Sequence, residues 1–138
     1  MKKFQTKIKY ITLIPLIMLI FSICQGGEPG GNVVVIESET DFYEYINRET
    51  PVLVDFYADW CRPCRIQGPI VESVSEEMSD KLIVLKLDVD AFPRIAAKYQ
   101  VRNIPTLILY KKGESLWNGI GLKQKEQIQA AVNAHIRN

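Results

Sequence analysis

The segment Val54-Asp55-Phe56-Tyr57-Ala58-Asp59-Trp60-Cys61-Arg62-Pro63-Cys64 decides how this chain folds. It begins inside the apolar run 52–57, which predicts a strand buried on both faces in the middle of a covered sheet. The chain then turns after Ala58, and apolar positions at helical spacing predict a helix from Cys61 onward. Two cysteines three residues apart therefore stand at a helix start, directly after a buried strand.

The first cysteine of this pair lies where a thiolate is stabilised. Unpaired backbone N–H groups and the positive end of the helix dipole favour an anion, so Cys61 should ionise more readily than a free thiol and is interpreted as the nucleophile. Cys64 lies one turn further in and faces the interior. It is expected to attack a mixed disulfide formed on Cys61, and thus to be the resolving thiol. The pair would then form a reversible disulfide and react with the disulfides of other proteins, without a cofactor.

A Cys-x-x-Cys pair can also be half of a zinc site, which would need two more Cys or His ligands. The only other cysteine, Cys24, lies outside the predicted domain, and the only histidine is His135 on the last predicted helix. We therefore expect no metal site.

A carboxylic acid interrupts the buried strand at Asp55. Burying its anion is costly, so Asp55 should have a raised pKa or a charged partner. It lies six residues before Cys61, and it could accept the proton that Cys64 loses when it attacks. Lys86, in the candidate strand 83–87, is the expected charge partner. A buried ion pair with a purely structural role is the alternative.

The remaining pattern alternates strands and helices. Apolar periodicity and turn residues predict strands at 33–36, 52–57, 82–87, 104–110 and 114–120, and helices after Ser38, from Cys61 with a kink at Pro69, at 92–99 and at 124–136. The order βαβαβαββα predicts an α/β domain whose first part forms a parallel sheet, while the terminal hairpin adds antiparallel edge strands.

The N-terminal segment has the layout of a secretory signal. Lysines at positions 2, 3, 7 and 9 precede an uncharged apolar run to Ile23, which is shorter than the roughly 20 residues of a comfortable membrane span. Cys24 closes this run, as in a bacterial lipoprotein signal, where the cysteine is lipid-modified. An incidental cysteine in a cleaved signal, or an uncleaved anchor, are the alternatives. We expect a signal at 1–24, a glycine-rich linker at 25–31 and one domain at 32–138.

Length, composition and charge indicate the number of domains and the class of binding partner. A length of 138 residues with 47% hydrophobic and 24% charged residues suits one ordinary globular domain. Without its four N-terminal lysines the chain is mildly acidic, so no nucleic-acid partner is expected. We expect a monomer that meets the membrane through its N-terminal anchor.

Further motifs follow along the chain: Pro69, Lys86, Ile104-Pro105-Thr106, Gly113 and Gly121. Together with the segment around the cysteines, they resemble the thioredoxin family over about Val33 to Asn138. This resemblance implies a central mixed five-stranded sheet flanked by four helices. It also implies that Pro105 is a cis proline packed against the cysteines and that the backbone of Ile104 hydrogen-bonds an extended substrate. Trp60, Pro105 and Gly121 would border what we call the substrate groove.

Two positions depart from the family pattern. Arg62 replaces a small glycine between the cysteines, and Asn103 replaces a small residue before Ile104. With Pro63, Arg62 is expected to tune the redox poise, because a cation beside Cys61 favours its thiolate and makes the disulfide a stronger oxidant. Selection of acidic partners by a solvated Arg62 is an equal alternative.

These features favour an exported thiol–disulfide oxidoreductase on the periplasmic side of a bacterial membrane. It would keep protein substrates reduced with electrons from a membrane thiol-reductant donor. One alternative is a relative working as a thiol oxidant, or as a reductase dedicated to one client such as apocytochrome c. A second is a cytoplasmic thioredoxin fed by a flavin reductase, if residues 1–24 are not a signal. The third is a redox-inert binding module that uses the groove only as a surface.

Overall fold

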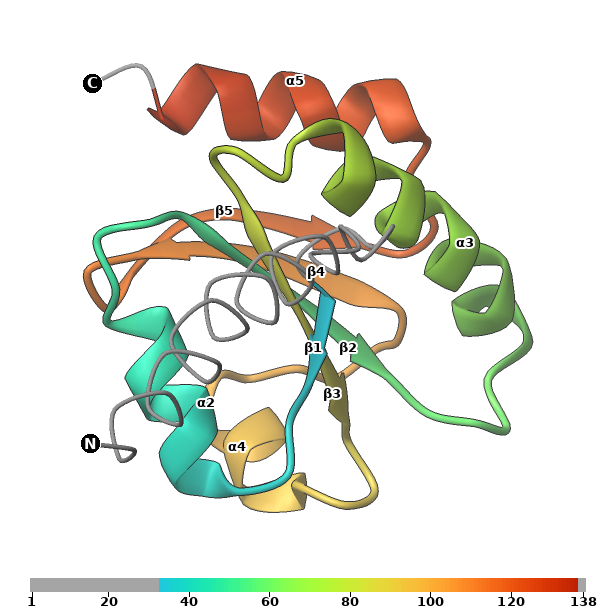
Figure 1. Ribbon diagram of the computed structural model, residues 1–138. Helices are drawn as coiled ribbons and strands as arrows, with labels where there is room; N and C mark the ends of the chain where they lie inside the picture. Colours follow the sequence, from blue (N-terminus) through green and yellow to red (C-terminus); the bar gives the residue numbers. More distant parts are fainter. Residues whose placement is uncertain (1–32, 137–138) are drawn as a thin grey trace, which may run out of the picture.

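Five strands form one mixed sheet in the order β1-β3-β2-β4-β5 in the computed structural model, which describes residues 33–136 (Figure 1). The strands are β1 (Val33–Val35), β2 (Val52–Tyr57), β3 (Ile83–Asp88), β4 (Thr106–Lys111) and β5 (Glu114–Ile120). The helices are α2 (Glu39–Ile46), α3 (Arg62–Glu77), α4 (Pro93–Lys98) and α5 (Lys125–Ile136). The predicted βαβαβαββα order, with a five-stranded sheet and four helices, is confirmed.

The first three strands pair in parallel and the last two form an antiparallel hairpin, as predicted, but β4 does not lie at the expected edge of the sheet. β1 and β2 each pair in parallel with β3, whereas β4 is antiparallel to both β2 and β5. The hairpin was expected to add edge strands, but β4 lies inside the sheet because it pairs with β2 on one side and β5 on the other. The edges are β1 and β5.

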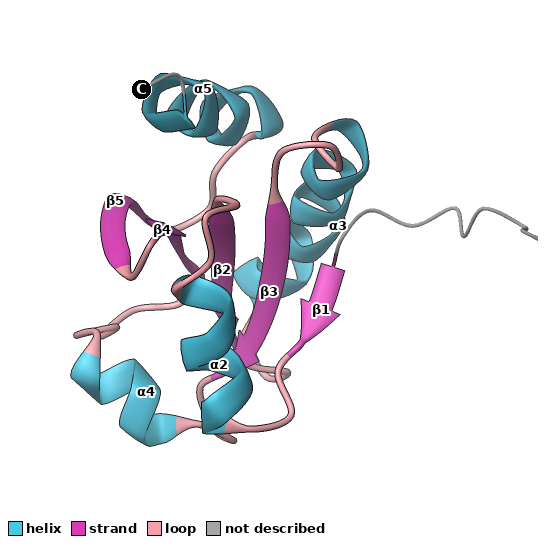
Figure 2. Ribbon diagram, turned by 60° about the vertical axis from the view of Figure 1, so that its left-hand side comes forward, coloured by secondary structure: helices cyan, strands magenta, loops and turns pink. Residues whose placement is uncertain are grey.

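Helices cover both faces of the sheet, α3 and α5 on one side and α2 and α4 on the other (Figures 1 and 2). Because successive side chains of a strand point to opposite faces, β2 supplies both cores. Val52, Val54 and Phe56 pack on the α2/α4 side, and Leu53 packs on the α3/α5 side. Asp55 has the same parity as Leu53 and therefore faces α3.

Local signals account for most element boundaries. Ser38 caps α2, its hydroxyl accepting a hydrogen bond from the Asp41 N–H at 3.1 Å. Pro69 lies inside α3 without ending it. β3 and β4 begin one and two residues later than predicted. The segment before β4 is held by the Thr106 hydroxyl, which donates to the Asn103 carbonyl at 2.7 Å.

The expected signal at 1–24, the linker at 25–31 and Cys24 lie outside the described residues. Among residues 33–136, no helix combines the length and apolar character needed to cross a bilayer.

Candidate active site

The two cysteines stand at the junction between β2 and α3. Cys61 is the N-cap residue of α3, and its Sγ accepts a hydrogen bond from the Cys64 backbone N–H at 3.2 Å. Cys61 and Cys64 are joined by a disulfide, with their Cα atoms 5.2 Å apart. Position 61 therefore meets the unpaired amides of a helix start, the environment that stabilises a thiolate.

The disulfide is largely covered by its surroundings. Cys61 is 3% exposed and Cys64 5%, and they pack with Ala58 and with the partly buried Tyr57 and Ile104. Arg62 and Pro63, the first two residues of α3, are exposed beside the pair. Proline is well accommodated here, since the first helical N–H groups have no intrahelical partner. An exposed arginine charge thus lies directly beside the disulfide in the sequence, at the start of α3.

Asp55 is a buried carboxyl group of β2, on the face of the sheet that α3 covers. It is 1% exposed, and neither carboxylate oxygen has a hydrogen-bond partner. Burial raises its pKa to about 7; Lys86 lowers this pKa in part, and the Glu72 carboxylate raises it. A carboxyl group that is half ionised near neutral pH can both take up and release a proton under physiological conditions.

Lys86 is the expected charge partner of Asp55, but the two side chains form no direct ion pair. The two residues lie directly opposite each other in the β2–β3 register. However, the Lys86 ammonium forms its ion pair with Glu72, at 3.5 Å. Lys86 therefore acts on Asp55 as a charge partner, as expected, and lowers its pKa, but it does so without an ion pair because its ammonium is held by Glu72 on α3.

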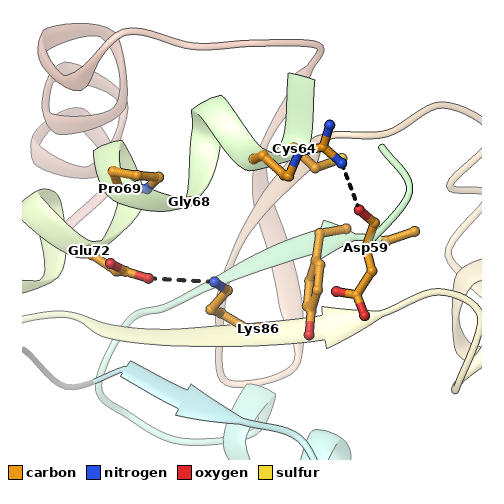
Figure 3. Close-up of a pocket in the computed structure, with 9 residues that line it drawn as sticks. Asp59, Cys64, Gly68, Pro69, Glu72 and Lys86 are labelled. Atoms are coloured by element: carbon orange, nitrogen blue, oxygen red, sulfur yellow. Dashed lines mark hydrogen bonds and ion pairs between the residues drawn. The ribbon is translucent and has the colours of Figure 1, made fainter. Parts of the chain in front are cut away.

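A cavity of about 230 Å³ lies between α3 and the ends of β2 and β3. Figure 3 shows Cys64 towards one end of it and the Glu72–Lys86 ion pair towards the other. Gly68 forms part of the wall, and a Cβ atom there would lie 3.7 Å from the Lys86 Nζ. The cavity has room for water molecules and polar groups to bind them, and both Cys64 and Lys86 line it.

The three residues expected to border the substrate groove come from three loops. Trp60 is 69% exposed, and its indole N–H donates to the Asp90 carboxylate at 2.7 Å. The Ile104–Pro105 peptide bond is cis, as the resemblance implies. Gly121 has φ +76°, a conformation that favours glycine, and its N–H donates to the Pro105 carbonyl at 2.8 Å. The cis-proline loop and the Gly121 loop are therefore bonded to each other.

Sequence reasoning missed two residues of α3, Glu72 and Gln67. Glu72 lies eight residues after Cys64, with Gly68 midway, so helical spacing places all three on one side of α3. Gln67 is an amide on an otherwise buried helix face and is fully buried. A polar side chain at an apolar position was the available signal for Gln67. For Glu72, the available signal was its spacing of four and eight residues from Gly68 and Cys64, which places the three on one side of a helix.

Metal ligands do not gather at this site. Within the part of the chain that the structure describes, no group of three or more His, Cys, Asp or Glu side chains is placed to hold a metal ion. His135 instead contacts the Ala131 carbonyl at 2.7 Å on α5.

The sequence of this chain is similar to those of known proteins of one family. The family model described as Thioredoxin matches residues 33–134. Thioredoxin from Rickettsia bellii is 43% identical over 93 residues, which are 67% of this chain and 89% of that protein. Thioredoxin from Bacillus subtilis is 38% identical over 104 residues, which are 75% of this chain and all of that protein.

Two solved structures have the same fold. Thioredoxin from Malassezia sympodialis superposes with a TM-score of 0.73 at 34% identity, covering 79% of this chain and 95% of that one. A mutant thioredoxin from Halobacterium salinarum also reaches 0.73, at 30% identity, covering 82% of this chain and 98% of that one. With its disulfide-bonded cysteine pair at the start of α3, this chain belongs to the thioredoxin family and is a thiol–disulfide oxidoreductase of that type.

Proposed function

We propose that this protein reduces disulfides of other proteins in the cell envelope, with Cys61 as nucleophile and Cys64 as resolving thiol. The observation that carries the assignment of roles is the hydrogen bond from the Cys64 N–H to the Cys61 Sγ at the helix start. The same amide and the helix dipole stabilise negative charge on the Cys61 sulfur in the reduced protein.

The reaction starts from the reduced protein. The Cys61 thiolate attacks one sulfur of a substrate disulfide, forming a mixed disulfide, and the other substrate sulfur leaves as a thiolate. Cys64 then loses its proton and attacks the Cys61 sulfur, which breaks the mixed disulfide and releases the second substrate sulfur. The substrate has gained two electrons, and the Cys61–Cys64 disulfide has formed.

Asp55 is the proposed acceptor of the Cys64 proton. It lies on the face of β2 towards α3, and burial brings its pKa to about 7, so its anion is present at neutral pH and can take a proton. Neither oxygen of the Asp55 carboxylate has a hydrogen-bond partner among the described residues. Cys64 lines the cavity and Asp55 does not, so the proton would pass from Cys64 to Asp55 through a water molecule between them. Lys86, on the wall of this cavity, would stabilise the Asp55 anion until the proton arrives.

Export and anchoring are proposed from the N-terminal sequence. Basic residues followed by an uncharged apolar run favour a secretory signal, and Cys24 at its end favours lipid modification. The protein would then draw electrons from a membrane thiol-reductant donor. Fractionation of cells, together with labelling by a palmitate analogue, tests this location: a Cys24→Ala variant should lose the label. A soluble cytoplasmic wild-type protein would contradict export.

The direction of electron flow is tested by equilibrating the protein with glutathione buffers. A reductase should have a potential near that of thioredoxin, about −270 mV. A value near −120 mV, typical of a strong oxidant, would overturn the proposed direction. The exposed arginine at position 62 is the specific feature that favours this second candidate, because it stabilises the reduced form. The variant Arg62→Gly, with the residue common in the family, should have the lower potential if Arg62 acts in this way.

Activity is tested by reduction of insulin in the presence of dithiothreitol. The wild-type protein should accelerate the precipitation of insulin chains, whereas Cys61→Ser should not. Absence of any acceleration by the wild-type protein would instead favour a redox-inert binding module.

A further inference from the structure

The buried amide of Gln67 bonds both backbone groups of one distant residue. Its Oε1 accepts from the Lys123 N–H at 2.8 Å, and its Nε2 donates to the Lys123 carbonyl at 3.2 Å. Gln67 lies on α3 one turn after Cys64, and its side chain is fully buried. We call this pair of bonds the amide clamp. It joins the helix that carries the cysteines to the short segment between β5 and α5.

The clamped segment belongs to the substrate groove. Lys123 follows two residues after Gly121, which has φ +76° and whose N–H donates to the Pro105 carbonyl at 2.8 Å. The Lys123 ammonium also donates to the Ile120 carbonyl at 2.5 Å and to the Gly121 carbonyl at 3.4 Å. Hydrogen bonds therefore run from α3 through Lys123 and Gly121 to the cis-proline loop, linking the helix of the cysteines to two walls of the groove.

A glutamine suits this position for a chemical reason. Its amide offers an acceptor and a donor side by side, matching one N–H and one carbonyl of an extended backbone. An apolar side chain of the same size would fill the space but leave both Lys123 groups without this partner, which carries a desolvation cost. The chain thus places a polar residue among Cys64, Val71 and Val74 on the buried face of α3.

We propose that Gln67 is a positioning residue for substrate recognition: the amide clamp holds the Gly121 wall of the groove at a set distance from the cysteines. The inference rests on the proposed function, in which an extended segment of a protein substrate lies in this groove. Gln67 touches neither sulfur in the proposed reaction. Its effect should therefore fall on binding of protein substrates and leave thiol chemistry unchanged.

The test compares a protein substrate with a small one. Gln67→Met keeps side-chain length and removes both hydrogen bonds. We expect its KM for insulin to rise about five- to tenfold, as loss of one or two hydrogen bonds allows, with kcat within a factor of two. The rate of the reduced variant with hydroxyethyl disulfide, which is too small to span the groove, should equal that of wild type. An unchanged KM, or an equal loss with both substrates, would overturn the proposal.

A structural readout accompanies the kinetics. In Gln67→Met the Lys123 amide should exchange with deuterium about tenfold faster or more, since its acceptor is gone, while the Ile128 amide in α5 keeps its rate. Val74→Ala, which shortens a buried side chain of the same helix away from the groove, is the matched control and should leave KM for insulin unchanged. An equal rise of KM in Val74→Ala would show that general loosening of α3 is responsible, which overturns the specific role.

Two further outcomes have a defined meaning: a variant that does not fold, and a wild-type protein that does not reduce insulin. If Gln67→Met does not fold, Gln67→Leu replaces it: leucine is apolar and of similar volume, and it can neither accept from the Lys123 N–H nor donate to the Lys123 carbonyl, so KM should again rise. If the wild-type protein fails to reduce insulin, the proposed function fails, and the groove role of Gln67 fails with it. That result differs from an active wild type whose Gln67 variants are unaffected.

Discussion

Lys86 lies directly opposite Asp55 on the neighbouring strand, yet its ammonium is paired with Glu72, 3.5 Å away on α3. The Asp55 carboxylate is buried without a hydrogen-bond partner, and burial raises its pKa to about 7. Burial therefore sets the pKa of Asp55 in the main, and two charged groups, Lys86 on β3 and Glu72 on α3, adjust it in opposite directions. The pKa of Asp55 therefore depends in part on Glu72, a residue of α3 that forms no hydrogen bond with it.

The first prediction concerns stability and pH. Burial raises the Asp55 pKa from 3.8 to about 7, so between these values the unfolded chain binds fewer protons here than the folded one. The free energy of unfolding therefore falls as pH rises from about 4 to 7. Asp55→Asn should be more stable than wild type at pH 8, by up to about 3–4 kcal/mol, and similar to it at pH 4. Urea denaturation at both pH values measures this.

The control for this experiment is Asp80→Asn, an exposed carboxylate whose removal should change little at either pH. A stability difference of the same size at pH 4 and pH 8 would mean that Asp55 does not titrate in this range.

The second prediction concerns turnover by the same variant. If Asp55 accepts the Cys64 proton, Asp55→Asn should slow release of the second substrate sulfur by about tenfold or more. The first attack by Cys61 should be affected much less. Stopped-flow measurement of mixed-disulfide lifetime separates the two steps. Wild-type resolution should speed up as pH rises through about 7, and the variant should lack this increase; identical pH profiles would remove Asp55 from the mechanism.

The third prediction concerns Glu72. Its carboxylate raises the pKa of Asp55 and engages Lys86. In Glu72→Gln one negative charge disappears and the lysine is no longer ion-paired, so both changes favour the Asp55 anion. The Asp55 pKa should fall below its value in wild type, which carbon NMR of the carboxyl group can follow. Glu76→Gln, an exposed residue of the same helix, is the control and should leave that pKa unchanged. A rise in Glu72→Gln would contradict the charge arrangement.

The fourth prediction separates the two sulfurs. In Cys64→Ser the mixed disulfide on Cys61 cannot be resolved, so protein substrates should accumulate as covalent adducts on non-reducing gels. Cys61→Ser should trap far fewer, because only position 61 is the N-cap of α3, where the Cys64 N–H stabilises a thiolate. Stronger trapping by Cys61→Ser would reverse the assignment of nucleophile and resolving thiol.

The sequence predicted the elements because their patterns are local. The apolar run 52–57, the Ser38 cap and the cysteine spacing each fix a conformation over a few residues. The position of β4 between β2 and β5 depends instead on pairing between distant segments, which no local pattern states. The same holds at the site: Asp55 was recognisable as a carboxyl in an apolar strand, but the Glu72–Lys86 ion pair required the packing of α3 on the sheet.

The start of β1 also has a consequence for orientation. Val33 pairs with Val84, towards the beginning of the parallel strands, whereas the disulfide follows the far end of β2. A six-residue strand spans about 20 Å. The disulfide and Val33, where the described chain begins, therefore lie at opposite ends of the parallel strands. The point where the chain enters the sheet is therefore remote from the end at which the sulfurs meet a client protein.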